Sequence, residues 1–315
     1  MSRAADSYGT GYVLTTIARS AEGDYRWTRR PGPHRGGALR TPDPAVLDAA
    51  RTAARGRVGL TLPEQADATG MTYRTGQARS IAAMLLGPRS GESDADIARI
   101  TADTFVETGA ALARLHAVPL PRADLPSPDG LLRLLSWLQD GLGPGAAPDL
   151  HRHATEMLGR DRMATVAAWC VPVTEAPHAL LHGGPSMGIL LPLTPDMDGG
   201  LLTGENLAAG PPESDVGWII GELVELGASI RRFGTRRDFD FDMFIGRVLE
   251  GYTAALDLAA VGRTAALRFL THLHDFAAYM KWHDVLVEYL KLVADVIDAA
   301  GAGQLLPSPG EVVRS

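Results

Sequence analysis

The sequence predicts an α+β protein in two parts, a small mixed lobe over 1–90 and a larger helical lobe over 91–300. Short segments with apolar residues at every second position gather in the first part, which is typical of strands. Long segments with apolar residues three and four apart fill the second part, which is typical of helices. The end, 301–315, contains Gly and Pro and is expected to be a flexible tail.

The elements of the first part follow from alternation and turn residues. A hairpin is predicted over 11–31, where alternation continues on both sides of a Glu-Gly-Asp turn. Asp43 followed by Pro44 is a good helix start, because Asp caps free amides and Pro fits the first helical position. Two further strands are predicted over 58–62 and 71–75.

The second part begins with a helix that Ser93 caps and that ends before Pro119. One extended section, 179–202, is rich in Leu and predicts a small β-element between the helices. Further helices are predicted over 130–140, 149–169, 215–232, 239–258, 263–280 and 284–300.

Composition excludes several classes of protein. The net charge of -7 gives no basic surface for a phosphate backbone, so a nucleic-acid partner is not expected. Each apolar stretch is interrupted well before the roughly 20 residues that span a bilayer, so no membrane insertion is expected. Cys170 is the only cysteine, and residues 1–11 lack the apolar run of a signal peptide. These features predict a cytoplasmic protein.

Three blocks of the second part resemble signature blocks of the aminoglycoside phosphotransferase family. Residues 181–190 read Leu-His-Gly-Gly-Pro-Ser-Met-Gly-Ile-Leu and are similar to the family's His-Gly-Asp-x-x-x-Gly-Asn block. Residues 201–206, Leu-Leu-Thr-Gly-Glu-Asn, with 210–218, Gly-Pro-Pro-Glu-Ser-Asp-Val-Gly-Trp, resemble its metal-binding block. Residues 109–117 resemble its helix ending in Ala-x-Leu-His. The blocks occur in family order, and the resemblance implies a two-lobed protein-kinase-like fold.

Three positions depart from the family pattern. Gly184 stands where the family has its catalytic Asp, Ile189 where it has Asn, and Thr203 where it has the metal-binding Asp. The resemblance implies ATP and Mg²⁺ as cofactors, but Gly has no side chain to orient a hydroxyl and Ile cannot ligate a hard cation. The only lysines are Lys281 and Lys291, so the small lobe has none to hold phosphates. Ordinary kinase turnover is therefore not expected.

The resemblance leaves five candidate site residues. His182 and Glu205 are the candidate catalytic residues, and Glu205 is also the candidate metal ligand. Gly9 and Gly11 lie where a glycine-rich loop over phosphates is expected, although a plain loop explains them equally well. Arg26, Arg29 or Arg30 could pair phosphates, with Arg29 taken as the candidate, and the alternative is a solvated arginine on an edge strand.

Other motifs have structural explanations. Asp215 begins a predicted helix and is expected to cap its free amides rather than to act in catalysis. Residues 184–188 match the G-x-S-x-G motif of hydrolases around Ser186, but a strand rather than a helix is predicted to follow it. His272 and His274 are two apart on a predicted helix, which favours packing or surface roles over a metal site.

Three functions are compatible with the sequence. Kinase-like proteins similar to this family occur in actinobacterial peptide-modifying systems, those of class V lanthipeptides and thioamitides, where one works with a lyase to dehydrate Ser and Thr. The blocks at 201–206 and 215–226 resemble such members, which implies a precursor peptide and a lyase as partners. The alternatives are a scaffold without turnover, which Ile189 favours, and a divergent small-molecule phosphotransferase.

Overall fold

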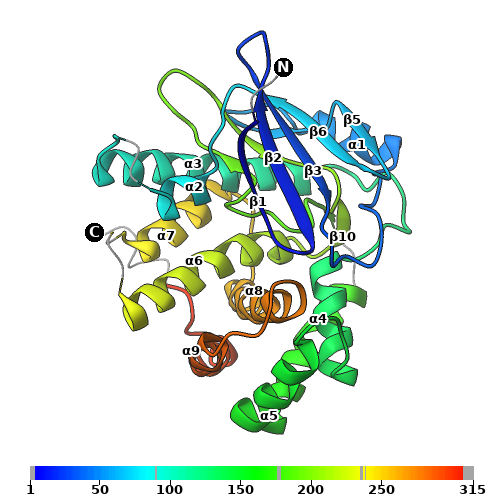
Figure 1. Ribbon diagram of the computed structural model, residues 1–315, viewed down its shortest axis with the longest axis vertical. Helices are drawn as coiled ribbons and strands as arrows, with labels where there is room; N and C mark the ends of the chain where they lie inside the picture. Colours follow the sequence, from blue (N-terminus) through cyan, green and yellow to red (C-terminus); the bar gives the residue numbers. More distant parts are fainter. Residues whose placement is uncertain (1–3, 89–90, 176–178, 235–236, 238, 308–315) are drawn as a thin grey trace.

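A five-stranded antiparallel sheet forms most of the small lobe, in the order β1-β2-β3-β6-β5. The computed structural model describes residues 4–88, 91–175, 179–234, 237 and 239–307 (Figure 1). The predicted hairpin is confirmed, with Thr16 of β2 opposite Thr28 of β3. The strands are β1 (Ala4–Gly9), β2 (Val13–Arg19), β3 (Tyr25–Pro31), β5 (Gln65–Asp67) and β6 (Gly70–Thr75).

One face of this sheet packs into the core. Alternate residues of β2, β3 and β6, including Ile17, Trp27 and Tyr73, are almost completely buried. Helix α1 (Pro44–Thr52) begins as predicted, because the side chain of Asp43 accepts a hydrogen bond from the Ala45 amide. Strand β1 and the short helix α2 (Ile81–Leu86) were not predicted from the sequence.

A second sheet contains strands from both lobes. Strand β4 (Val58–Thr61) pairs in parallel with β9 (Gly199–Leu202), which pairs antiparallel with β8 (Leu190–Leu191). Strand β7 (Ala179–Leu181) pairs with β10 (Ala208–Gly210) beside it. The predicted extended section is therefore confirmed, but β4 of the small lobe pairs with strands of the large lobe and not with the five-stranded sheet.

Helices make up the rest of the large lobe (Figure 1). Gly217 and Gly221 on α6 face α8 so closely that an added Cβ would lie 2.5 Å from Thr264 Cβ and 2.6 Å from Arg268 Cβ, respectively. The helices are α3 (Asp94–His116), α4 (Asp129–Asp140), α5 (Ala147–Glu175), α6 (Glu213–Phe233), α7 (Phe241–Gly251), α8 (Leu258–Tyr279) and α9 (Val285–Gly301).

Two helix boundaries differ from the prediction. The helix predicted over 239–258 ends at Gly251, and α8 begins at Leu258 rather than at residue 263. The reason is a cap: the carboxylate of Asp257 accepts hydrogen bonds from the amides of Ala259 and Ala260. Helix α5 runs on to Glu175 with a kink at Gly159.

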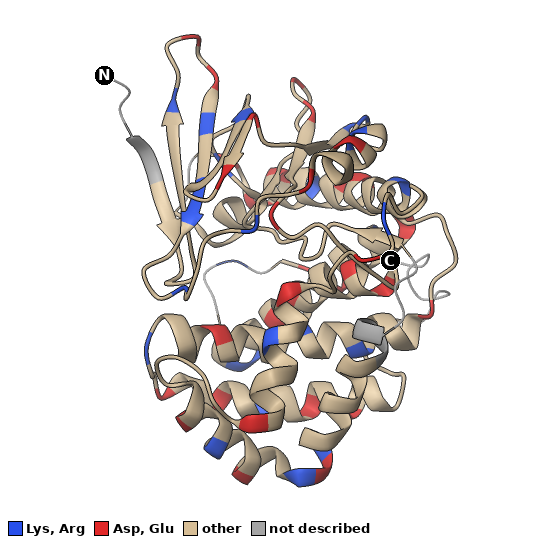
Figure 2. Ribbon diagram, turned by 90° about the vertical axis from the view of Figure 1, so that its right-hand side faces the viewer, with Lys and Arg blue, Asp and Glu red and all other residues tan. Residues whose placement is uncertain are grey.

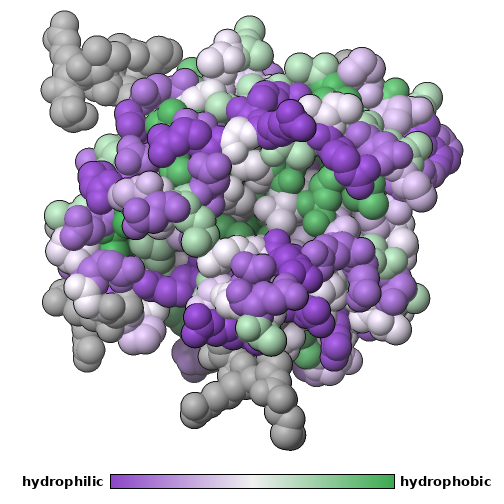
Figure 3. Space-filling model, turned by 90° about the horizontal axis from the view of Figure 1, so that it is seen from above, coloured by the Kyte–Doolittle hydropathy of each residue, from purple (hydrophilic) through white to green (hydrophobic). Residues whose placement is uncertain are grey.

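Acidic and basic residues are interspersed along the helices and strands of both lobes (Figure 2). Viewed from above, hydrophilic residues border hydrophobic patches (Figure 3). Among the described residues, no helix is long and apolar enough to cross a membrane. Beyond α9, Leu305 and Leu306 pack against the core, and the remainder of the predicted tail, 308–315, lies outside the described residues.

Candidate functional site between the lobes

The loop that follows β7 is held from below by one buried carboxylate. Asp215, with 1% of its surface exposed, accepts hydrogen bonds from the backbone amides of His182 (2.6 Å) and Gly183 (2.9 Å). Nε2 of His116 donates to the same carboxylate over 3.0 Å. The hydroxyl of Tyr252 in turn contacts Nδ1 of His116 over 2.9 Å, and burial raises the pKa of Tyr252 to about 12. We call Asp215, His116 and Tyr252 the brace.

The brace corrects one expectation. Asp215 was predicted to cap the amides of its own helix, but its oxygens are directed to the loop at 182–183 instead. It lies inside the first turn of α6, which starts at Glu213, rather than before it. Its role is structural, as expected, although the contact is tertiary and spans more than thirty residues of chain.

His182 is buried beneath the loop in its neutral form. Its Nε2 lies 3.0 Å from the carbonyl oxygen of Leu202, which can only accept, so the proton is on Nε2. Its Nδ1 is buried and has no hydrogen-bond partner among the described residues. Burial lowers the pKa of His182. Gly183, next to it, has φ +81°, and a Cβ there would lie 1.8 Å from the Asn206 carbonyl oxygen, so only glycine fits.

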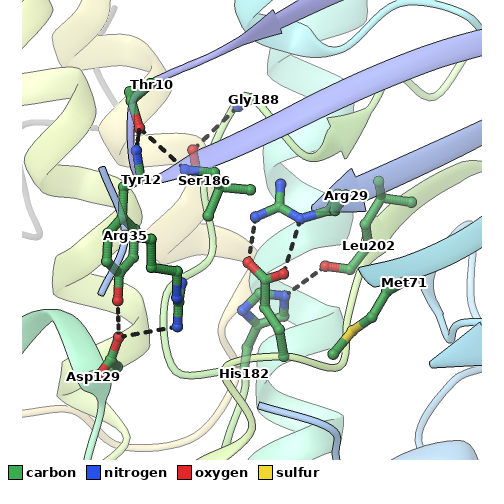
Figure 4. A network of polar contacts seen from close by, with 12 residues as sticks. Thr10, Tyr12, Arg29, Arg35, Met71, Asp129, His182, Ser186, Gly188 and Leu202 are labelled. Atoms are coloured by element: carbon green, nitrogen blue, oxygen red, sulfur yellow. Dashed lines mark hydrogen bonds and ion pairs between the residues drawn. The ribbon is translucent and has the colours of Figure 1, made fainter. Parts of the chain in front are cut away.

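Arg29 and Glu205 form an ion pair at the junction of the lobes (Figure 4). The guanidinium of Arg29, on β3, donates to both carboxylate oxygens of Glu205, with Nε 3.3 Å from Oε2. Their side chains are 12% and 8% exposed. Although burial acts to lower it, attraction to Glu205 holds the pKa of Arg29 above its ordinary value. The structure thus brings together two predicted site residues that were given separate roles.

The three replaced positions offer little to a metal ion. Thr203 is fully buried, and its hydroxyl donates to the Leu201 carbonyl over 2.8 Å. Ile189 is 6% exposed and has no ligand atom. With Glu205 engaged by Arg29, the residues present do not fit a magnesium site of the kind that phosphoryl transfer uses. Among the described residues, no group of three or more His, Cys, Asp or Glu side chains could hold a metal.

The turn with Gly9 and Gly11 joins β1 to β2 and is pressed onto the large lobe. Gly11 approaches α8 so closely that a Cβ there would lie 2.1 Å from the Tyr279 carbonyl oxygen. The hydroxyl of Tyr12 donates to Asp129 over 2.5 Å (Figure 4). It also accepts a hydrogen bond from Arg133 over 2.9 Å. Close packing between lobes therefore explains the glycine at position 11 without a phosphate ligand.

Two further contacts of the small lobe reach across the junction. The hydroxyl of Tyr8, on β1, donates to the Gly188 carbonyl over 2.6 Å. Nδ1 of His34 lies 2.8 Å from the Tyr279 carbonyl oxygen and donates to it. Sequence reasoning missed these residues and Asp129, because hydroxyl and carboxylate contacts across lobes leave no local pattern. The helix ending in His116 was recognised as a family block, which was a usable signal for the brace.

The hydrolase motif does not form a nucleophile elbow. Oγ of Ser186 accepts a hydrogen bond from the Gly188 amide over 3.2 Å, and the short strand β8 follows rather than a helix. The amide of Met187 is held by Glu222, whose other oxygen pairs with Arg268 over 2.6 Å. Within the described ranges, the only parallel strands are β4 and β9.

His272 and His274 are both in contact with carboxylates of the large lobe. His272 pairs with Glu225, and His274 lies buried with its Nδ1 2.9 Å from Asp275. They do not converge on a common point. This arrangement agrees with packing and surface roles.

Comparison with known proteins identifies the fold. No protein-family model matches the sequence, and no curated protein matches it. Among solved structures, an ethanolamine kinase from Plasmodium vivax superposes with a TM-score of 0.56 at 10% identity, over 95% of this chain and 81% of that one. The aminoglycoside phosphotransferase APH(2'')-Ib, bound to ADP, superposes with a TM-score of 0.53 at 12% identity, over 98% and 95%. At such identities the likeness establishes the two-lobed, kinase-like phosphotransferase fold alone.

Proposed function

We propose that this kinase-like protein acts by binding, as a subunit of a peptide-modifying complex, and that its cleft does not carry out metal-assisted phosphoryl transfer. The observation that supports this most directly is the buried Arg29–Glu205 pair. Glu205, the candidate metal ligand, is neutralised by Arg29, the candidate to hold phosphates. Because Arg29 and Glu205 are bonded to each other, Glu205 is not available to hold magnesium and Arg29 is not available to hold phosphates.

The replaced residues support the same proposal. Transfer to a hydroxyl needs a carboxylate that orients the hydroxyl and oxygen ligands that place magnesium on the phosphates. Gly184 has no carboxylate, and a Cβ at this position would lie 3.5 Å from Asn206 Nδ2, in ordinary contact. The space is open, but the φ of +155° at Gly184 is one that residues with a side chain rarely adopt, so this backbone is suited to glycine. His182, neutral and bonded to Leu202, does not replace the missing acid.

A peptide is the proposed ligand because of the sequence resemblance described above. On this proposal the protein holds a precursor peptide so that a partner lyase can act on its Ser and Thr residues. The alternatives are a scaffold with no peptide ligand and a phosphotransferase acting on a small molecule. Each makes a different prediction for nucleotide and peptide binding.

The test is a titration with ATP, with and without Mg²⁺, followed by assays of labelled phosphate transfer to the precursor peptide and to an aminoglycoside. We expect no tightening by Mg²⁺ and no transfer, together with saturable binding of the peptide. Binding of ATP that requires Mg²⁺, with transfer that Glu205→Gln abolishes, would contradict the proposal. If the peptide does not bind either, the remaining candidate function is a scaffold with no peptide ligand.

Glu205→Gln also serves as a control on the ion pair. Because it removes the carboxylate that neutralises Arg29, we expect metal-free ATP to bind this variant more tightly than the native protein, by about tenfold if one charge-assisted hydrogen bond forms. Asp196→Asn removes an exposed acid from the turn between β8 and β9 and is expected to leave ATP affinity unchanged. An equal effect of the two substitutions would mean that overall charge, not Arg29, governs nucleotide affinity.

A further inference from the structure

Arg40 is a partly buried cation without a carboxylate partner. It lies at the end of the loop 35–40, Arg-Gly-Gly-Ala-Leu-Arg, which leads from β3 towards α1. Its Nη2 donates to the Leu207 carbonyl of the large lobe over 2.5 Å, and within the part of the chain described it forms no ion pair. Burial lowers the pKa of the Arg40 guanidinium. Arg40 is therefore partly screened from water and has no acid bonded to it, so an anion beside its guanidinium would be favoured.

Arg35, at the other end of the loop, is also poorly neutralised. Its guanidinium lies 4.2 Å from the centre of the Tyr12 ring, and the oxygen of Asp129 is 4.0 Å from it, at the limit of an ion pair (Figure 4). The same Asp129 oxygen is bonded more closely by Arg133, at 2.7 Å, and by the Tyr12 hydroxyl. Asp129 is therefore largely satisfied by other groups.

The charges at this point do not balance. Arg35, Arg40 and Arg133 contribute three positive charges, while the acids bonded to them, Asp129 and Asp275, contribute two negative ones. An excess positive charge at the junction of the lobes is notable in a chain with a net charge of -7. Because guanidinium groups stay protonated, only an added anion can neutralise this excess.

The loop between the two arginines has free donors and open space. Among the described residues, the backbone amides from Gly36 to Arg40 donate to no protein acceptor. Gly36 and Gly37 are exposed, and a Cβ at either would meet nothing within 4 Å. Leu39, at 2% exposure, anchors the loop in the core. Backbone amides flanked by arginines form the kind of surface that binds oxyanions.

We infer that the loop 35–40 is a binding site for a phosphate-class oxyanion, held by the guanidinium groups of Arg35 and Arg40 and by the amides of Gly36 and Gly37. A phosphate monoester presents three oxygens that can accept from both arginines and from the loop amides at the same time, whereas a carboxylate presents two. The site is separate from the Arg29–Glu205 pair, and it does not depend on the function proposed above. Inorganic phosphate and a phosphorylated peptide share this chemistry.

The test is calorimetric titration of the full chain, in a buffer of low ionic strength without other oxyanions, with inorganic phosphate and with O-phosphoserine peptide as separate arms. We expect saturable binding that weakens about tenfold in Arg40→Gln, as the loss of one charge-assisted contact predicts. The matched control is Arg122→Gln, which removes an exposed arginine already paired with Asp43 and Asp124. It should leave phosphate affinity within about twofold.

A second variant keeps the inference testable if Arg40→Gln does not fold. Gly36→Asp places a carboxylate in open space beside the arginines, so we expect it to compete with phosphate and to abolish its binding. Tighter binding of the peptide than of free phosphate would identify a phosphorylated protein segment as the ligand, and equal binding would identify free phosphate. Absence of phosphate binding by the native chain, or equal weakening by Arg40→Gln and Arg122→Gln, would overturn the inference.

Discussion

The loop after β7 is bonded to the brace at His182 and Gly183, and Gly184 follows directly, yet these neighbouring positions differ in the polar contacts they make. On the brace side, Asp215 holds two backbone amides and His116, and it is almost completely buried. On the opposite side, Gly184, Ile189 and Thr203 present no carboxylate or amide to the cleft. The backbone of this loop is thus held by buried polar contacts, whereas positions 184, 189 and 203 contribute no carboxylate.

This difference shows that the shape of a catalytic loop and its chemistry depend on separate residues. The left-handed Gly183 and the carboxylate below it fix the path of the backbone regardless of what stands at position 184. The Arg29–Glu205 pair lies on the reactive side but is also satisfied internally. Four experiments test whether the contacts that hold the loop and the Arg29–Glu205 pair contribute independently to stability.

Asp215→Ala should have the largest effect, because it leaves two buried amides and His116 without their acceptor. We expect the free energy of unfolding in urea to fall by about 3 to 5 kcal/mol. Asp196→Ala, at an exposed turn, is the control and should change it by less than about 0.5 kcal/mol. Similar values for the two variants would mean that the brace does not hold the loop.

Breaking the Arg29–Glu205 pair should cost less. Arg29→Met or Glu205→Gln alone is expected to lower the free energy of unfolding by about 2 to 3 kcal/mol, since each leaves one charge nearly buried and unpaired. The double variant Arg29→Met with Glu205→Gln should lose less than the sum of the single changes, since it leaves neither charge. Additive losses in this double-mutant cycle would show that the two side chains act independently.

His182 makes the loop sensitive to acid. Because burial lowers its pKa in the folded protein, the unfolded chain takes up a proton near pH 6.5 while the folded chain does not. The contribution of neutral His182 to the free energy of unfolding is therefore fully present above pH 6.5. It is lost as the pH falls below 6.5, by up to about 1.4 kcal/mol per pH unit. The measurement is the free energy of unfolding between pH 5 and 8 for the native protein, for His182→Gln and for His283→Gln. His283 is exposed and serves as the control. The pH dependence should be weaker in His182→Gln than in the native protein and unchanged in His283→Gln.

Tyr12→Phe should have the smallest effect, because it removes one hydroxyl and leaves the ring in place. Loss of the contacts with Asp129 and Arg133 is expected to cost about 1 to 2 kcal/mol of unfolding free energy. Tyr25→Phe, which removes a hydroxyl without a described hydrogen bond, is the comparison. If the two substitutions cost the same, the turn is held by packing against Tyr279 rather than by the hydroxyl.

Most elements of the fold could be predicted from the sequence, because they depend on local periodicity and caps. The helix start at Asp43 and the hairpin over 11–31 are examples, and both are confirmed. Strand β1 was missed because Ala-Ala-Asp-Ser-Tyr-Gly contains no β-branched residue and shows weak alternation. Strand β4 was recognised, but its partner 140 residues away leaves no local trace.

The candidate site could be predicted only in part. The family resemblance drew attention to Arg29, His182 and Glu205, and the structure places them near one another (Figure 4). It could not show that Arg29 and Glu205 bind each other, since pairing is decided by geometry and not by residue type. The contacts of Tyr8 and Tyr12 across the lobes depend on tertiary structure in the same way.

The parallel pairing of β4 with β9 has a consequence for motion. Gly199 donates to the Arg57 carbonyl and Thr203 to the Thr61 carbonyl, so backbone bonds at both ends of β4 cross from one lobe to the other. A hinge movement of the small lobe would have to break the hydrogen bonds between β4 and β9 or move β9 with it. We therefore expect the molecule to meet its ligands as a single stiff body, selecting them by a preformed surface rather than by closing around them.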